Sequence, residues 1–191
     1  TLPDNYRDKM LAGCLINHGY YNRLIGNVEQ ALVFYDSSFH IYEKLNMKDG
    51  LAYCLNNMGV IYDNLGNLEE AINCYQKSLD YQEEIDDKEG LANSLSNIGE
   101  VYCVQGDLES ALNYLNRALG IQKEINLPRG EAMTLNKIGD IYREKKEYQK
   151  ALEYIEESLE INRKIEDKTG IASSLREIAN LYFDEGNFDK A

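Results

Sequence analysis

The sequence predicts an all-α solenoid of antiparallel helix pairs, because one pattern of residues returns about every forty positions along the chain. The pattern joins a small residue to a tyrosine three positions later, as in Gly59 and Tyr62. The tyrosine recurs at Tyr102, Tyr142 and Tyr182, and the small residue at Gly19, Gly99, Gly139 and Ala179. A fixed period of this size is the signature of stacked repeats rather than of one central core.

Three further positions keep the same period and mark the parts of each repeat. A glycine expected in the turn between the two helices is found at Gly26, Gly66, Gly106 and Gly186. An alanine of the second helix is found at Ala31, Ala71, Ala111, Ala151 and Ala191. A glycine expected in the loop between repeats is found at Gly50, Gly90, Gly130 and Gly170. The predicted repeats are residues 11–50, 51–90, 91–130, 131–170 and a partial 171–191, preceded by residues 1–10 as a lead-in or the end of an earlier helix.

These residues carry a family resemblance. The second repeat contains, in order, Leu55, Met58, Gly59, Tyr62, Gly66, Ala71, Tyr75 and Ser78. In this it resembles the tetratricopeptide repeat, a helix-turn-helix motif usually about 34 residues long, and its longer spacing is similar to the forty-residue subclass. The resemblance implies a right-handed superhelix in which the first helix of each repeat, the A helix, lines an inner wall. Leucine replaces the tryptophan that often opens the motif, and the closing proline is absent.

Each element has a local signal. The first A helix is expected over Leu11–Ile25 and its B helix over Val28–Leu45, with the next loop over Asn46–Gly50. The B helices show apolar residues at three- and four-residue spacing, which predicts one buried stripe.

The expected helix ends follow capping chemistry. Asn67 is expected to cap the second B helix in a capping box with Glu70, as Asn27 does with Gln30 one repeat earlier. Asp87 and Asp167 are expected to cap A helices, and Pro128 fits a first helical position. In the fourth repeat Lys146-Glu147 replaces Gly-Asn. That turn is therefore predicted to be the least well defined.

Composition restricts the class of partner. The formal net charge is -13, which disfavours nucleic acid and anionic membranes and favours neutral or basic proteins and peptides. No apolar run approaches the roughly 18 residues of a membrane span. The cysteines Cys14, Cys54, Cys74 and Cys103 show no Cys-x-x-Cys pairing and fit free thiols in a reducing cytoplasm. We expect a cytoplasmic protein.

Helix geometry places the functional face. With about 100° per residue, Leu55, Gly59 and Tyr62 share the packed side, and Tyr53 and Asn57 fall opposite. If the A helices line an inner wall, that opposite face forms a peptide-binding groove. The predicted groove residues are Asn17, Tyr20, Tyr53, Asn57, Val60, Asn64, Asn93, Asn97, Glu100, Lys137, Asp140, Glu144, Arg176, Glu177 and Asn180. Amide and apolar side chains dominate the first half, and carboxylates dominate the second.

The sharpest feature of this face is the ladder of Asn17, Asn57 and Asn97. An amide both donates and accepts, so a row of amides can pair with the backbone of an extended peptide. The structural alternative is that these amides bond to neighbouring A helices and fix their stacking. A carboxylate-binding clamp is not expected, since only Lys137 and Arg176 offer cations. A peptide with apolar or small residues at one end and Lys or Arg at the other fits better.

Catalysis has no candidate residues. His18 occupies a packing position and His40 an outer one, and neither has a partner in register. No spacing of His or Cys matches a metal site, no phosphate-binding glycine loop is present, and no cofactor is expected. The sequence therefore predicts a binding protein, not an enzyme.

Three functions agree with this pattern. The first is a protein-interaction scaffold that binds a partner's peptide in the groove. The second is the sensory or autoinhibitory region of a larger bacterial signalling protein, such as a histidine kinase, a nucleotide cyclase or a transcription regulator. The third is self-association through the partial last repeat, where Leu175, Ile178 and Tyr182 lack a full covering helix.

Overall fold

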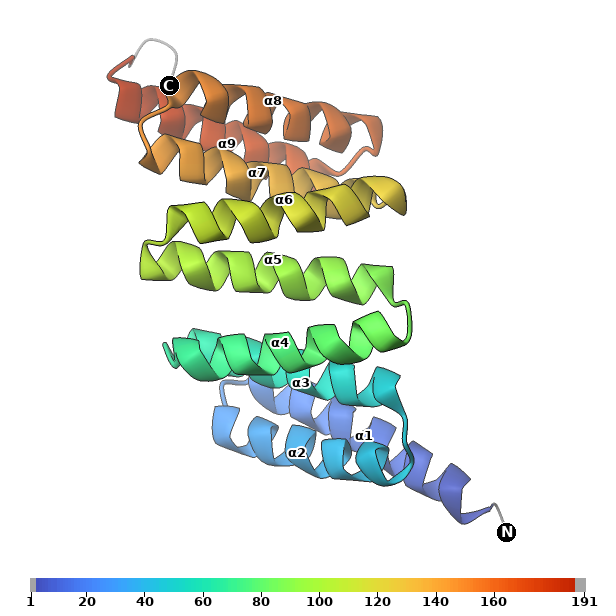
Figure 1. Ribbon diagram of the computed structural model, residues 1–191. Helices are drawn as coiled ribbons and strands as arrows, with labels where there is room; N and C mark the ends of the chain where they lie inside the picture. The colour runs from blue at the N-terminus through green and yellow to red at the C-terminus, as the bar shows by residue number, and fades with distance from the viewer. Residues whose placement is uncertain (1–2, 188–191) are drawn as a thin grey trace. The chain divides into compact units, whose positions relative to one another are not determined.

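The structure is a computed structural model that describes residues 3–187. Within that range all regular secondary structure is helical (Figure 1). The helices are α1 (Asp4–Leu24), α2 (Val28–Lys44), α3 (Lys48–Asn64), α4 (Leu68–Glu84), α5 (Lys88–Gln105), α6 (Leu108–Glu124), α7 (Pro128–Glu144), α8 (Tyr148–Lys164) and α9 (Lys168–Glu185). None of the helices described is both long and apolar enough to span a bilayer. Ala191 and the first two residues of the lead-in lie outside the described range.

The chain forms two compact units, the N-terminal half (residues 1–101) and the C-terminal half (residues 102–191), and the division falls inside α5. In the N-terminal half α1 packs on α2, α2 on α3, and α3 on α4. In the C-terminal half α6 packs on α7, α7 on α8, and α8 on α9, while α7 also contacts α9. Tight turns join these helices, so consecutive helices run antiparallel. The predicted pairs α1 with α2, α3 with α4, and α7 with α8 are confirmed.

The recurrent small residue of the A helix is required by close packing. Tyr75 of α4 is buried against Gly59 of α3. A Cβ built on Gly59 would lie 2.6 Å from the Tyr75 ring, and one on Gly139 would lie 2.6 Å from Ile155. The small residue and the large buried residue of the B helix therefore fit each other, as interior packing requires.

The glycines expected in the loops between repeats lie inside helices, which corrects the sequence analysis. The A helices begin at Lys48, Lys88, Pro128 and Lys168, two residues before each glycine. The reason is again space. A Cβ on Gly50 would lie 2.4 Å from the ring of Tyr42, and one on Gly170 would lie 2.3 Å from Oδ1 of Asn162.

The first helix also starts earlier than expected. It begins at Asp4 rather than Leu11, so residues 4–10 of the lead-in continue α1 without a break. Because this segment has no glycine and no proline after Pro3, nothing in it interrupts the helix.

The structure confirms the N-caps predicted at the aspartates and contradicts those predicted at the asparagines. Oδ1 of Asp87 accepts the Gly90 N–H at 2.9 Å, and Oδ1 of Asp167 accepts the Thr169 and Gly170 N–H groups at 3.0 Å each. Asn27 and Asn67 precede their helices but make no side-chain capping bond. The Nδ2 of Asn27 instead donates to Oδ1 of Asn22 at 3.2 Å. Pro128 is the first residue of α7, as expected.

The turn of the fourth repeat is as regular as the others, contrary to expectation. Lys146 adopts φ 60°, the left-handed conformation that Gly66 adopts at φ 77°. The Lys146 N–H donates to the Arg143 carbonyl at 2.9 Å, which matches the Gly66 N–H bond to Asp63 at 2.9 Å. The hydrogen bonds of the turn therefore hold lysine in a conformation that glycine adopts more readily.

Candidate functional site

Two neighbouring pockets open on the predicted face of the N-terminal half. The first has a volume of about 610 Å³ and is lined by α1, the end of α2 and the start of α3. Met10, Ile16 and Tyr42 give it an apolar wall, and the predicted residues Asn17 and Tyr53 stand at its border. The pocket is therefore suited to an apolar side chain.

The second pocket has a volume of about 310 Å³ and lies between α3, α4 and α5. Its lining is polar and acidic. It consists of Asp49, Ala52, Tyr53, Asn56, Gln82, Asp87, Glu89, Gly90 and Asn93. Tyr53 and Asp49 line both pockets, and the Tyr53 side chain is 49% exposed. An exposed tyrosine thus separates an apolar pocket from an acidic one.

The asparagine ladder does not form one open row. Asn17 is exposed, but Asn57 is only 8% exposed. The Tyr35 hydroxyl donates to Oδ1 of Asn57 at 3.5 Å, and Nδ2 of Asn57 donates to the Tyr53 carbonyl at 2.9 Å. The Asn57 amide is therefore buried and bonded to a B helix and to its own helix, so it neither lines an open groove nor joins two A helices.

Asn97, the third rung, is half-buried and also takes part in packing. Its Nδ2 donates to Oδ1 of Asn56 on α3 at 3.1 Å. The amide therefore joins two A helices while its edge stays accessible. Of the ladder, only Asn17 has the exposure that the peptide-binding hypothesis requires.

The other predicted residues of the N-terminal half lie near the surface. Tyr20 is exposed, and the guanidinium of Arg23 lies 5.3 Å from its ring centroid. Asn64 is exposed and bonds to its own helix, and Asn93 is exposed at the border of the second pocket. Val60 and Glu100 are half-buried.

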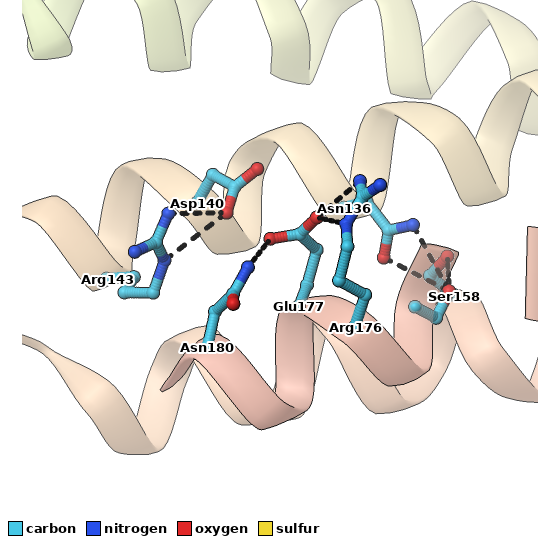
Figure 2. Close-up of polar contacts among 8 residues, drawn as sticks. Asn136, Asp140, Arg143, Ser158, Arg176, Glu177 and Asn180 are labelled. Carbon is cyan, nitrogen blue, oxygen red and sulfur yellow. Dashed lines mark hydrogen bonds and ion pairs between the residues drawn. The ribbon is translucent and has the colours of Figure 1, made fainter. Parts of the chain in front are cut away.

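The predicted residues of the C-terminal half converge more closely. Figure 2 shows Asp140 of α7 and Glu177 of α9 on facing helices. Glu177 is 7% exposed and accepts from Arg176 at 2.8 Å and from Asn180 at 3.1 Å. Arg143 contacts Asp140 at 3.3 Å. The sequence thus located four members of one cluster, Asp140, Arg176, Glu177 and Asn180, but not Arg143.

The two carboxylates of this cluster titrate differently. Burial, with the negative charge of Glu177 adding to it, raises the pKa of Asp140 to about 6, although Arg143 opposes the shift. Burial also disfavours ionised Glu177, but hydrogen bonds from Arg176 and Asn180 outweigh it, so the pKa of Glu177 is lowered. The pair therefore carries one firm negative charge and one that is gained above about pH 6.

Arg143 is the residue that sequence reasoning missed in this half. Its Nη1 donates to Oδ2 of Asp184 at 2.7 Å, so one guanidinium joins Asp140 and Asp184. Lys137 is half-buried and Glu144 is exposed. Arg143 directly follows the recurring tyrosine Tyr142 and is not among the residues of the predicted groove face.

In the N-terminal half sequence reasoning found Tyr53 and Asn93 of the acidic pocket but missed its other polar residues, above all Gln82 and Asp87. A signal was present in the sequence. The position of Gln82 recurs as polar Gln122 and Asn162 on the otherwise apolar stripe of the B helices. A repeated polar residue on a buried stripe indicates that something polar lies opposite.

Within residues 3–187, no group of three His, Cys, Asp or Glu side chains is arranged to hold a metal ion. The four cysteines are free thiols, and only Cys54 among them is buried. Leu175 of α9 is exposed, whereas Ile178 and Tyr182 are half-buried. Self-association through α9 stays a prediction.

Comparison with known proteins identifies the repeat. A family model described as tetratricopeptide repeat matches residues 11–84, 53–124 and 130–191. The structure of BtubC (BKLC) from P. vanneervenii has a TM-score of 0.85 at 19% identity, and the match covers 98% of this chain and 78% of that one. Aspartyl phosphate phosphatase F from Bacillus subtilis has a TM-score of 0.82 at 17% identity, covering 99% and 58%.

A third solved structure, the apo form of RapI, has a TM-score of 0.82 at 19% identity and covers 93% of this chain and 65% of that one. No curated protein matches the chain in sequence. At these identities the structural matches bear on the fold, and they confirm the predicted all-α solenoid class.

Proposed function

Because the chain belongs to the tetratricopeptide repeat family, whose fold is typical of protein-interaction scaffolds, we propose that it binds a peptide segment of a partner protein along the exposed face of its A helices. In the N-terminal half the bound segment passes over Tyr53, with one side chain in each of the two pockets. The net charge of -13 favours a neutral to basic partner.

The observation that carries this proposal is the position of Tyr53. Its ring is about half exposed and borders both pockets. Tyrosine offers a large contact area with little side-chain entropy to lose, and it is enriched among the residues that dominate binding energy. Asn17 and Asn93 stand on either side, on α1 and α5, with amides available to a peptide backbone.

The remaining predicted residues take secondary places in the proposal. Tyr20, Asn64, Asn97 and Glu100 extend the face within the N-terminal half. Asn57 does not contact the peptide in this proposal but supports Tyr53, since its amide donates to the Tyr53 carbonyl. The cluster of Asp140, Arg176, Glu177 and Asn180 provides a separate polar surface in the C-terminal half. No residue is assigned a catalytic role, and the proposed location is the cytoplasm.

The test is a selection of peptides from a random phage-displayed library against the protein, followed by anisotropy measurements with the selected peptides carrying a fluorescent label. Tyr53→Ser should weaken their binding about tenfold or more, the size expected for a dominant contact. Tyr21→Ser is the matched control, because Tyr21 is also exposed but lines neither pocket.

Equal affinity of the selected peptides for the parent and for Tyr53→Ser would contradict the proposed face. A sensory or autoinhibitory role makes a different prediction about the natural ligand. The segment that occupies the groove would then belong to the same polypeptide, and a synthetic peptide of that segment would compete with the labelled peptides.

A further inference from the structure

The acidic pocket of the N-terminal half contains carboxylates that the protein itself does not neutralise. Asp49, Asp87 and Glu89 line it together. Oδ1 of Asp87 caps the Gly90 N–H. Among the residues that the structure describes, none of these three carboxylates forms an ion pair. The pocket therefore presents negative charge to whatever enters it.

A buried amide side chain also lines this pocket. Gln82 is 4% exposed and lines the pocket, and its Oε1 has no hydrogen-bond partner. A buried amide oxygen without a donor is costly, and native structures leave few of them. This oxygen is independent of the carboxylates, and it too requires a hydrogen-bond donor.

The C-terminal half contains the equivalent pocket two repeats later, with a volume of about 220 Å³. Arg129 occupies the register position of Asp49, Asn162 that of Gln82, and Asp167 that of Asp87. Nε of Arg129 lies 3.2 Å from Oδ2 of Asp167. The Asn162 Nδ2 donates to the hydroxyls of Ser158 and Ser174 at 3.4 and 3.3 Å. In this copy the chain provides its own guanidinium to the capping carboxylate.

The two copies differ at the decisive position, because Asp49 stands where the second copy has Arg129. The first copy therefore keeps the capping carboxylate, lacks the guanidinium, and gains a further carboxylate. We infer that the acidic pocket of the N-terminal half binds the guanidinium of an arginine side chain in the bound peptide. This inference rests on the proposed function and specifies one residue of the ligand.

Arginine fits this pocket better than lysine. Its planar guanidinium has five N–H donors, enough to bond two carboxylates at once and still present a donor toward Gln82, whereas an ammonium is a point charge with three. The arginine stem can lie on the exposed ring of Tyr53 at the border of the pocket. Since Tyr53 also borders the apolar pocket, an apolar residue should stand close to the arginine in the peptide.

The test uses short acetylated peptides with one leucine and one arginine, placed at three different separations in an alanine and serine background. Matched peptides carry citrulline, which has nearly the shape of arginine but no charge. Each is titrated into the ¹⁵N-labelled protein to millimolar concentration. The arginine peptides should shift the Gly90 backbone and Gln82 side-chain resonances, and citrulline should weaken binding about tenfold or more.

Two substitutions that swap the residues at positions 49 and 129 test whether this position decides which pocket binds arginine. Asp49→Arg should pair with Asp87 as Arg129 pairs with Asp167, and so weaken the arginine peptides about tenfold or more. Arg129→Asp should open the second pocket, so that the arginine peptides also shift the Gly170 resonance. Asp80→Arg is the charge-matched control, because Asp80 is exposed and lines none of these pockets.

Equal binding of arginine and citrulline peptides would overturn the arginine site and leave the peptide-binding face intact. The same holds if Asp49→Arg weakens binding no more than Asp80→Arg does, because the effect would then come from net charge. Equal affinity of the library-selected peptides for the parent and for Tyr53→Ser would instead overturn the proposed function.

Discussion

Substituting Gly59 by alanine tests the packing rule that underlies every repeat. A Cβ at this position would lie 2.6 Å from the ring of Tyr75, where ordinary contact begins at 3.4 Å. The ring would therefore have to move by almost an ångström. Tyr75 is 1% exposed and closely surrounded, so it cannot move freely. The substitution places one methyl group in a space that is already filled.

The expected magnitude is the difference of two effects. Overpacking a core typically costs about 1–3 kcal/mol. Alanine in a helix interior returns about 1 kcal/mol relative to glycine. Gly59→Ala should therefore lower the free energy of unfolding by about 1 kcal/mol, and for a chain of this size that lowers the melting temperature by roughly 2–4 °C.

Gly120→Ala is the matched control, since Gly120 is also helical and a Cβ there has no atom within 4 Å. This variant should be more stable than the parent by about 0.5–1 kcal/mol. Both are measured by thermal and urea unfolding, followed by circular dichroism at the helical band. If Gly59→Ala were stabilised as much as Gly120→Ala, the close packing of Tyr75 on Gly59 would be refuted.

Three more predictions follow from particular residues. Lys146→Gly should stabilise the protein by about 0.5–1 kcal/mol, because Lys146 has φ 60°; an unchanged urea midpoint would contradict this. Asp167→Ala should cost about 1 kcal/mol through the lost cap at the start of α9, whereas Asp167→Asn should retain most of it in the same assay. The pKa of Asp140 is raised from 3.8 to about 6, so its protonated form stabilises the fold below pH 4 and this contribution is lost as the pH rises through 6. Asp140→Asn should therefore gain stability relative to the parent between pH 4 and pH 7.5, by about 1 kcal/mol after a discount for its 42% exposed side chain. A difference in melting temperature that does not change with pH would contradict the raised pKa.

The sequence by itself predicted the architecture because the evidence for it is local and repeated. The small residue at Gly59, the buried stripe through Ala71 and Tyr75, and the turn at Gly66 each follow from helix periodicity and turn chemistry. Their return in successive repeats multiplies a weak local signal. The A-helix face that contains Asn17, Tyr53 and Asn93 follows from the same arithmetic of 100° per residue.

Only the tertiary structure decided what that face contains, because the answers depend on which atoms another helix places opposite. Asn57 is buried since Tyr35 reaches it from α2. Gly90 lies inside a helix, where a Cβ would lie 2.7 Å from the Gln82 side chain. Periodicity fixes the direction in which a side chain leaves its own helix, but distances across a helix interface, and hence burial, pKa and pockets, are set by the partner helix.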